Sequence, residues 1–271
     1  MKVSRFLTLL FALVILAGCR ADDDVTCVTF VQYNVGVFNK YDESSIEAVA
    51  CALKEMKADI VSLNEVDSCA KRTGGVDQIT ELVKSMGGWN KSYASAMPFN
   101  GGAYGVGIVS DPKFPIVCTD KIALPKGNGY EPRTVAVVEY EDFVFASTHL
   151  DLVEDAQLRQ VEVIDHYIDS VYAEGTKPIF LAGDFNCVPT SAVVTALMKN
   201  WIQLTGVSHT FPSDVPDRCI DYIFMRPQGK NVRVVNTWTQ TALNTVDLST
   251  ASDHLPVLLT VVIDEGISSV E

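Results

Sequence analysis

Two polar side chains stand directly after a short apolar run, and their types suit work on a metal ion or a water molecule. Residues 179–182, Ile-Phe-Leu-Ala, are typical of a buried strand, and Gly183 allows a sharp turn at its end. Asp184 and Asn186 follow at alternate positions. In extended chain, this carboxylate and this carboxamide would point to the same side. The alternative is that Asp-Phe-Asn forms only a turn, since Asp and Asn favour turns.

Polar side chains follow three other apolar segments in the same manner. They are Asn34 after residues 25–33, Glu65 after residues 58–63 and Asn64, and His149 after residues 143–147. In α/β proteins the ends of such strands line the functional site. Taken alone, Glu65 would be a surface acid and His149 a satisfied core residue. Together with Asp184, Glu65 becomes a candidate ligand for a hard cation such as Mg²⁺.

The elements that must position these residues can be predicted from hydrophobic periodicity. Helices are predicted at residues 43–57, 79–86, 155–173 and 190–198. Further strands are predicted at residues 106–110, 116–124, 134–140, 219–225, 232–238 and 255–263. The glycine-rich residues 99–107 lack the Lys-Ser/Thr ending of a nucleotide-binding loop. We predict that they form a loop leading into the strand at 106–110.

Three more polar residues lie next to predicted strands. Arg133 precedes the strand at 134–140, where an ion pair is favoured over contact with a substrate phosphate. Asp221 lies in the strand at 219–225, and Asp253 with His254 precedes the last strand.

The beginning of the chain has the pattern of an export signal. Lys2 and Arg5 precede an apolar run at residues 6–17, which is too short to span a bilayer. The run closes with Leu-Ala-Gly-Cys, which resembles a bacterial lipobox with Cys19 as the lipidated residue. A plain secretory signal is the alternative. We predict a signal peptide at residues 1–18, an acidic tether at 19–26, and a lipid-anchored protein of the outer membrane, the cell surface or the periplasmic face.

Composition limits the remaining classes of function. The 271 residues are 48% hydrophobic, enough for one large core, and no linker or repeat divides them. The formal net charge of -13 repels a polyanion, so no stable nucleic-acid partner is expected. The cysteines beyond Cys19 are even in number, which leaves disulfides open in an exported chain, and none has the C-x-x-C spacing of a zinc site.

Six motifs taken together resemble the endonuclease/exonuclease/phosphatase family of metal-dependent phosphoesterases. In chain order they are Asn34, Asn64-Glu65, Thr148-His149-Leu150-Asp151, Gly183-Asp184-Phe185-Asn186, Asp221-Tyr222-Ile223 and Ser252-Asp253-His254-Leu255-Pro256. Each motif is weak alone, but six in register from about residue 27 to 263 are highly specific. The resemblance implies an α/β fold, a four-layer α/β/β/α sandwich of two packed mixed sheets flanked by helices, with a catalytic domain at 27–265.

The resemblance also implies a metal site. Glu65 would be the main ligand of Mg²⁺, with Mn²⁺ or Ca²⁺ as alternatives, and Asn34 and Asp253 would lie nearby. Oxygen donors of this kind suit Mg²⁺, which keeps several of its waters.

The remaining roles implied by the resemblance concern the phosphate. Asp184 would orient or deprotonate the attacking water, and Asn186 would hold that water or a phosphate oxygen. His254, paired with Asp221, would be kept charged and would donate to the phosphate, because a neighbouring carboxylate favours the imidazolium. His149 would be the second imidazole on the phosphate.

We therefore expect a monomeric phosphoesterase whose substrate is a small-molecule or lipid phosphodiester or phosphomonoester at the bacterial cell envelope. A secreted or surface nuclease of the same family is one alternative, and an inactive lipoprotein binding module is another. Three tracts resemble a compact bacterial subgroup of metal-dependent hydrolases: residues 73–78, 99–102 and 210–213.

Overall fold

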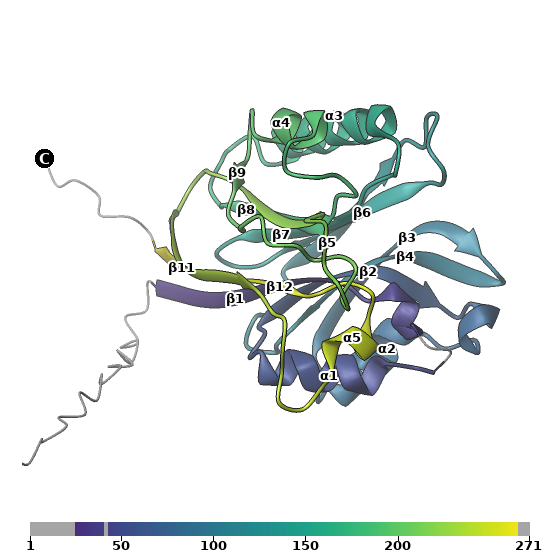
Figure 1. The fold of residues 1–271 in the computed structure, drawn as a ribbon. Coiled ribbons are helices and arrows are strands. Elements are labelled where there is room, and N and C mark those ends of the chain that lie inside the picture. Colours follow the sequence, from purple (N-terminus) through teal and green to yellow (C-terminus); the bar gives the residue numbers. More distant parts are fainter. Residues whose placement is uncertain (1–24, 41–42, 265–271) are drawn as a thin grey trace, which may run out of the picture.

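A computed structural model describes residues 25–40 and 43–264 (Figure 1). One mixed sheet has the strand order β11-β12-β1-β2-β4-β3. Its strands are β1 (Val25–Asn34), β2 (Ile60–Ser68), β3 (Asn90–Phe99), β4 (Gly102–Ser110), β11 (Asn231–Thr239) and β12 (Val257–Asp264). The second sheet has the order β5-β6-β7-β8-β10-β9. Its strands are β5 (Cys118–Leu124), β6 (Arg133–Glu139), β7 (Val144–His149), β8 (Ile179–Asp184), β9 (Ile202–Gln203) and β10 (Asp221–Arg226).

The helices lie on the outer faces of the two sheets (Figure 1). They are α1 (Ile46–Glu55), α2 (Gln78–Ser85) and α5 (Leu248–Ala251) on the first sheet, and α3 (Glu154–Val171) and α4 (Ala192–Leu197) on the second. Two short 3-10 turns follow β1 and β2, at Gly36–Phe38 and Lys71–Thr73. The predicted α/β/β/α sandwich of two mixed sheets is thereby confirmed. None of the helices within the described residues is both long enough and apolar enough to cross a membrane.

Three apolar clusters hold these four layers together. Val49 and Leu53 of α1 pack on the first sheet, and Val161 and Ile164 of α3 pack on the second. The third cluster fills the space between the sheets and includes Phe30. Burying each of these large side chains stabilises the fold by about 1.5–3 kcal/mol. The helices supply this burial on the outer faces of the sheets.

Strand direction brings distant parts of the chain to one edge. β1 and β2 run parallel, with Asn34 beside Asn64, and β7 and β8 run parallel, with His149 beside Asp184. The C-terminal ends of four strands therefore meet at the same end of the sandwich. Val25, where β1 begins, pairs with the last residue of β12 at the opposite end.

Several element boundaries differ from the prediction. β2 does not end at Asn64 but continues to Ser68. The glycine-rich tract is a loop only at residues 100–101, since Phe99 ends β3 and residues 102–107 form the first part of β4. A Cβ on Gly105 would lie 2.0 Å from the carbonyl oxygen of Ala94, so glycine permits the close approach of β3 and β4. β3, β9 and α5 were not predicted, because β3 mixes polar and apolar residues without a period and the other two are very short.

The N-terminal predictions fall mostly outside the described residues. The signal peptide at 1–18 and Cys19 lie there, whereas β1 includes Val25 and Thr26 of the predicted tether. The described cysteines Cys51, Cys69, Cys118, Cys187 and Cys219 form no disulfide.

Candidate active site

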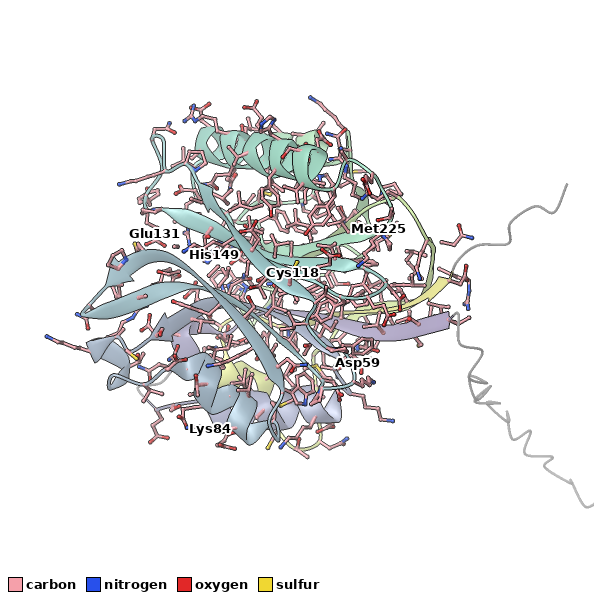
Figure 2. All side chains as sticks on the ribbon, turned by 180° about the vertical axis from the view of Figure 1, so that it is seen from behind. Asp59, Lys84, Cys118, Glu131, His149 and Met225 are labelled. Atoms are coloured by element: carbon pink, nitrogen blue, oxygen red, sulfur yellow. The ribbon has the colours of Figure 1, made fainter. Side chains whose placement is uncertain are left out.

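The structure brings together the polar residues that were predicted at strand ends. The first sheet and its loops contribute Asn34, Glu65, Asp253 and His254, and the second contributes Arg133, His149, Asp184, Asn186 and Asp221. Figure 2 shows Glu131 and His149 toward one end of the second sheet and Met225 toward the other. Asn34, Asp184 and Asp221 are almost completely buried, and Glu65, Asn186 and Asp253 are half-buried.

Glu65 is aimed into the site by a β-bulge. Leu63 pairs with Gly107 and Val66 with Gly105, so two residues of β2 oppose one residue of β4. Glu65 itself has a φ of 57°, in the left-handed region that is unusual for a residue with a side chain. Such bulges redirect side chains beside functional sites.

Asn34 connects the carboxylates of the two sheets. Its Nδ2 donates to Glu65 Oε1 at 3.1 Å and to Asp184 Oδ2 at 3.0 Å. Its Oδ1 accepts from the backbone N–H of Gly36 at 3.0 Å. In this orientation Asn34 positions two carboxylates through its amino group. A Cβ on Gly36 would lie 3.0 Å from Asp253 Oδ1, so this loop passes close beside the Asp253 carboxylate.

Asp184 and Asn186 do not point side by side from extended chain, so that sequence argument is wrong. β8 ends at Asp184, and Asn186 has a φ of 51°. The backbone N–H of Asn186 donates to Asp184 Oδ1 at 2.8 Å, while its side chain donates to the carbonyl of Leu150 at 3.0 Å. The segment is the turn given as the alternative, because the Asp side chain caps the backbone two residues on. The turn still holds Asn186 next to Asp184.

His254 is clamped by carboxylates. Its Nδ1 lies 2.9 Å from Asp221 Oδ2, and its Nε2 lies 3.6 Å from Asp184 Oδ2. Burial alone would lower the pKa of His254, but the charge and hydrogen bond of Asp221, with added effects of Asp184 and Asp253, raise that pKa to about 10. The imidazole is therefore charged at neutral pH.

In Asp184, burial favours the neutral form of the carboxyl and so raises its pKa. Burial, reinforced by the nearby charge of Asp221, raises the pKa of Asp184 to about 7 against the opposing charge of His254. Its Oδ2 lies 3.6 Å from Nε2 of His149. Burial, with the positive charges of Arg133 and His254, lowers the pKa of His149 well below its ordinary value. His149 is therefore a neutral imidazole beside a carboxyl that titrates near neutrality.

The oxygen donors at this end of the sandwich fit a divalent cation. Burial raises the pKa of Glu65, the hydrogen bond from Asn34 opposes this rise, and the neighbouring charge of Asp253 adds to it. A bound cation would offset the cost of two carboxylates so close together. Among the described residues, ligand atoms of Asp184, Asp221 and His254 also lie within 4.8 Å of one another, a spacing that permits a divalent metal.

Arg133 forms the predicted ion pair and keeps a free donor. Its Nη1 lies 3.0 Å from Glu131 Oε1, and its side chain is only 5% exposed. Its Nε is buried and has no hydrogen-bond partner within the described part of the chain. A buried donor without a partner costs about 1–3 kcal/mol, so a site that binds an anion would use it.

Gln32, Asn64 and Thr210 support the site but were given no role from the sequence. Asn64 Oδ1 accepts from the backbone N–H of Asp184 at 2.9 Å, and its Nδ2 donates to the Thr148 carbonyl at 2.7 Å. Thr210 Oγ1 donates to Asp221 at 2.6 Å. Gln32 contacts both Asn64 and Asp221. Gln32 could have been found, because it faces the same way as Asn34 in an otherwise apolar strand.

Comparisons with known proteins agree with this geometry. Residues 31–254 match the model of the endonuclease/exonuclease/phosphatase family. An endonuclease/exonuclease/phosphatase structure from Bacteroides vulgatus is 20% identical over 87% of this chain and 98% of its own, with a TM-score of 0.72. A mannosyl-6-phosphatase from Bacteroides thetaiotaomicron is 18% identical over 86% and 99%, with a TM-score of 0.73. The human Nocturnin catalytic domain, with bound sulfate, is 16% identical over 89% and 96%, at 0.68. No curated protein matches the sequence.

Proposed function

We propose that this chain, which belongs to the endonuclease/exonuclease/phosphatase family, hydrolyses a small, water-soluble phosphomonoester with the help of a divalent metal ion. Hydrolases of this family act on phosphate esters. The observation that carries the finer proposal is the pair formed by Asp184 and His254. A carboxyl with a pKa of about 7 lies 3.6 Å from an imidazole with a pKa of about 10.

The two members of this pair suit opposite tasks. A general base works best when its pKa lies near the operating pH, and Asp184 meets this condition for accepting a proton from the attacking water. The water would be held between Asp184 and the side chain of Asn186. His254 remains a donor throughout, because Asp221 keeps its ring charged. Its Nε2–H would donate to a phosphate oxygen whose negative charge grows during the reaction.

Arg133 and His149 would complete the phosphate site. The unpartnered Nε of Arg133 would donate to a second phosphate oxygen, and the neutral ring of His149 would donate without adding charge. The fixed positive charges of Arg133 and His254 suit a phosphomonoester, which carries more negative charge than a diester. The similarity in fold to a mannosyl-6-phosphatase supports the same substrate class.

Glu65 and Asp253 would hold the metal ion, and Asn34 would orient Glu65. We assign the ion to these residues because His254 and Asp221 already satisfy one another through a hydrogen bond. Mg²⁺ fits best, since the donors are all oxygen and the half-buried carboxylates leave room for bound water. When bound, it would neutralise charge on the phosphate and the departing oxygen.

The position of the beginning of β1, at the end of the sandwich opposite the site, favours a soluble substrate over a lipid. We propose export with lipidation at Cys19, as the sequence predicts. β1 begins at Val25 and carries Asn34 about 30 Å away at its other end. Residues 19–24 span at most about 20 Å even when fully extended. If β1 stands upright on this tether, the site would face away from the membrane, and we propose that the domain works in this orientation as a monomer.

A substrate screen tests this proposal. The chain from residue 20 onward would be assayed with Mg²⁺ and with EDTA on substrates of each class. The readouts are phosphate release from hexose 6-phosphates and ethyl phosphate, nitrophenol release from bis(4-nitrophenyl) phosphate, phosphocholine release from sphingomyelin vesicles, and strand cleavage of plasmid DNA. We expect Mg²⁺-dependent turnover that is fastest on the monoesters. Faster cleavage of DNA would favour the nuclease alternative. Absence of any turnover above the Asp184→Asn and His254→Ala variants would favour the binding module. His166→Ala, on the exposed face of α3, is the matched control.

A further inference from the structure

A cavity of about 250 Å³ lies beside the phosphate site, and the chemistry above does not use it. One wall is the turn after β1, with Val37 and Asn39, and the facing wall is the loop after β2, with Arg72 and Val76. Its volume is below the roughly 300–1,000 Å³ of sites that take drug-sized ligands. It therefore suits a single small group and not a nucleotide or an acyl chain.

The cavity adjoins the catalytic residues on both walls. Val37 directly follows Gly36. A Cβ on Gly36 would lie 3.0 Å from Asp253 Oδ1, so this turn passes close beside Asp253. On the other wall, Arg72 pairs with Asp67, which lies two residues after Glu65 in β2. The cavity therefore lies next to Asp253 and Glu65, the residues proposed to hold the metal ion.

Arg72 is fixed in place but keeps donors for a ligand. Its Nε and Nη2 bond to the two oxygens of the fully buried Asp67 at 2.7 and 2.8 Å. Its guanidinium lies 4.3 Å from the ring centre of Phe99 and 5.3 Å from that of Tyr104. Nη1 has no hydrogen-bond partner among residues 25–40 and 43–264. Such a rigid guanidinium loses little freedom when it binds a ligand.

The two walls are tied together before any ligand binds. Buried Gln78 accepts from the backbone N–H of Asp67 at 2.8 Å and donates to the carbonyl of Val37. The cavity is therefore built into the fold. Because Asp67 neutralises the charge of Arg72, the cavity offers hydrogen bonds without a net attraction for a second anion.

From this geometry we propose that the cavity receives the leaving group of the substrate, and that this group is a neutral polyol of the size of one hexose. Arg72 Nη1 and the polar side chains of the walls would bond its hydroxyls. The inference rests on the proposed phosphomonoesterase function. The Arg72 side chain is 38% exposed, so hydroxyls of the ligand would replace water on Nη1, and a substrate without hydroxyls would lose these bonds.

Arg72→Lys tests the hydrogen-bonding part of the inference. Lysine keeps a positive charge beside Asp67 but cannot reproduce the planar fork with its extra donors. We expect kcat/KM for a hexose 6-phosphate to fall about 10- to 100-fold, chiefly through KM, because a charged hydrogen bond is lost. Ethyl phosphate, a monoester whose alkyl group is small and has no hydroxyl, should be hydrolysed as before. Arg159→Lys, on exposed α3, is the matched control.

Val76→Trp tests the volume of the cavity without touching the ion pair. Val76 is 36% exposed, so a larger side chain there can fill the cavity without disturbing the core. Hexose 6-phosphate turnover should fall while ethyl phosphate turnover stays the same. Ser44→Trp fills the cavity from another wall and should have the same effect. Val171→Trp, at the exposed end of α3, is the control for adding a tryptophan.

The outcomes separate this inference from the proposed function. If ethyl phosphate is hydrolysed and hexose phosphates are not, the phosphomonoesterase function stands and the polyol inference is overturned. Equal losses on both substrates, or unchanged turnover of the hexose ester in the filled cavities, would also overturn it. If the unmodified protein hydrolyses no phosphomonoester at all, the proposed function fails and the inference fails with it.

Discussion

The space between the two sheets is apolar at one end and polar at the other. Phe30, in the middle of β1, stacks on Phe145 at 4.9 Å and packs on Phe180 at 4.6 Å between ring centres. Gln32 and Asn34 follow at alternate positions, so they enter the same space, but there they meet hydrogen-bonding groups. Within four residues of one strand, the contact between the sheets changes from aromatic packing to a polar network.

The two ends of this space have opposite effects on stability. Dense aromatic packing removes apolar surface from water and stabilises the sandwich. Carboxyls buried at the other end must lose their hydration, which is costly even when they are paired. The raised pKa of Asp184 is the mark of that cost. The packing at the apolar end thus offsets the cost of burying the carboxyls in the site.

The largest loss of activity is expected from Asp184→Asn, which changes only the polar end of the space between the sheets. Removing a general base typically lowers the rate about 10²- to 10⁴-fold. The amide keeps the size of the side chain and needs no proton, so the protein should stay folded. Steady-state kinetics and a thermal melt on the same sample measure both properties. A variant that lost stability along with activity would show that Asp184 stabilises the fold as well as serving the reaction.

Phe30→Ala is the converse change. Truncating a buried Phe typically costs about 3–5 kcal/mol, and Phe30 is fully buried between the sheets. Denaturant unfolding should show this loss, while kcat per folded molecule should change little, because Gln32 and Asn34 keep their partners. If kcat fell as steeply as in the Asp184 variant, the two ends of the space would not be separable.

The same contrast explains how much could be predicted from the sequence. Phe30, Asp184 and His254 lie in or next to short apolar runs, so local pattern was enough to place them in or at the end of strands. Their convergence then followed from the resemblance of ordered motifs to one family. The four-layer fold also followed from that resemblance, because the order of strands and helices was compatible with the fold but could not establish it.

What could not be predicted depends on contacts between distant segments. Asn64 bonds to Asp184, 120 residues away, and Gln32 to Asp221, 189 residues away. The bulge at Glu65 depends on pairing with the glycines of β4. The turn at Asn186 depends on a side chain capping its own backbone. Single-strand periodicity contains none of this information, so polar roles between the sheets were missed.

A smaller effect, on the pKa of His254 and on stability, should follow from Asp221→Asn, which tests the electrostatics of the polar end. Without the Asp221 charge, burial dominates and the pKa of His254 should fall from about 10. In the metal-free protein, NMR of the His254 ring would follow this change. Because the raised pKa stabilises the fold below pH 6.5 and that contribution is lost toward pH 10, the variant should lose stability most clearly below pH 6.5. An unchanged titration would mean that Asp221 only positions the ring.

The smallest effect is the pH dependence of stability without metal. The pKa of Asp184 rises from 3.8 in the unfolded chain to about 7 in the folded protein. The folded state therefore binds the proton more tightly, so stability from this group is fully present below pH 3.8 and is lost as the pH rises through about 7. Asp184→Asn lacks this loss. In EDTA, its advantage in melting temperature over the unmodified protein should grow from pH 4 to about pH 5.5, a range in which His254 is charged in both folded and unfolded chains. A constant difference across that range would show that Asp184 is ionised throughout, and that the polar end of the space costs the fold less than its burial implies.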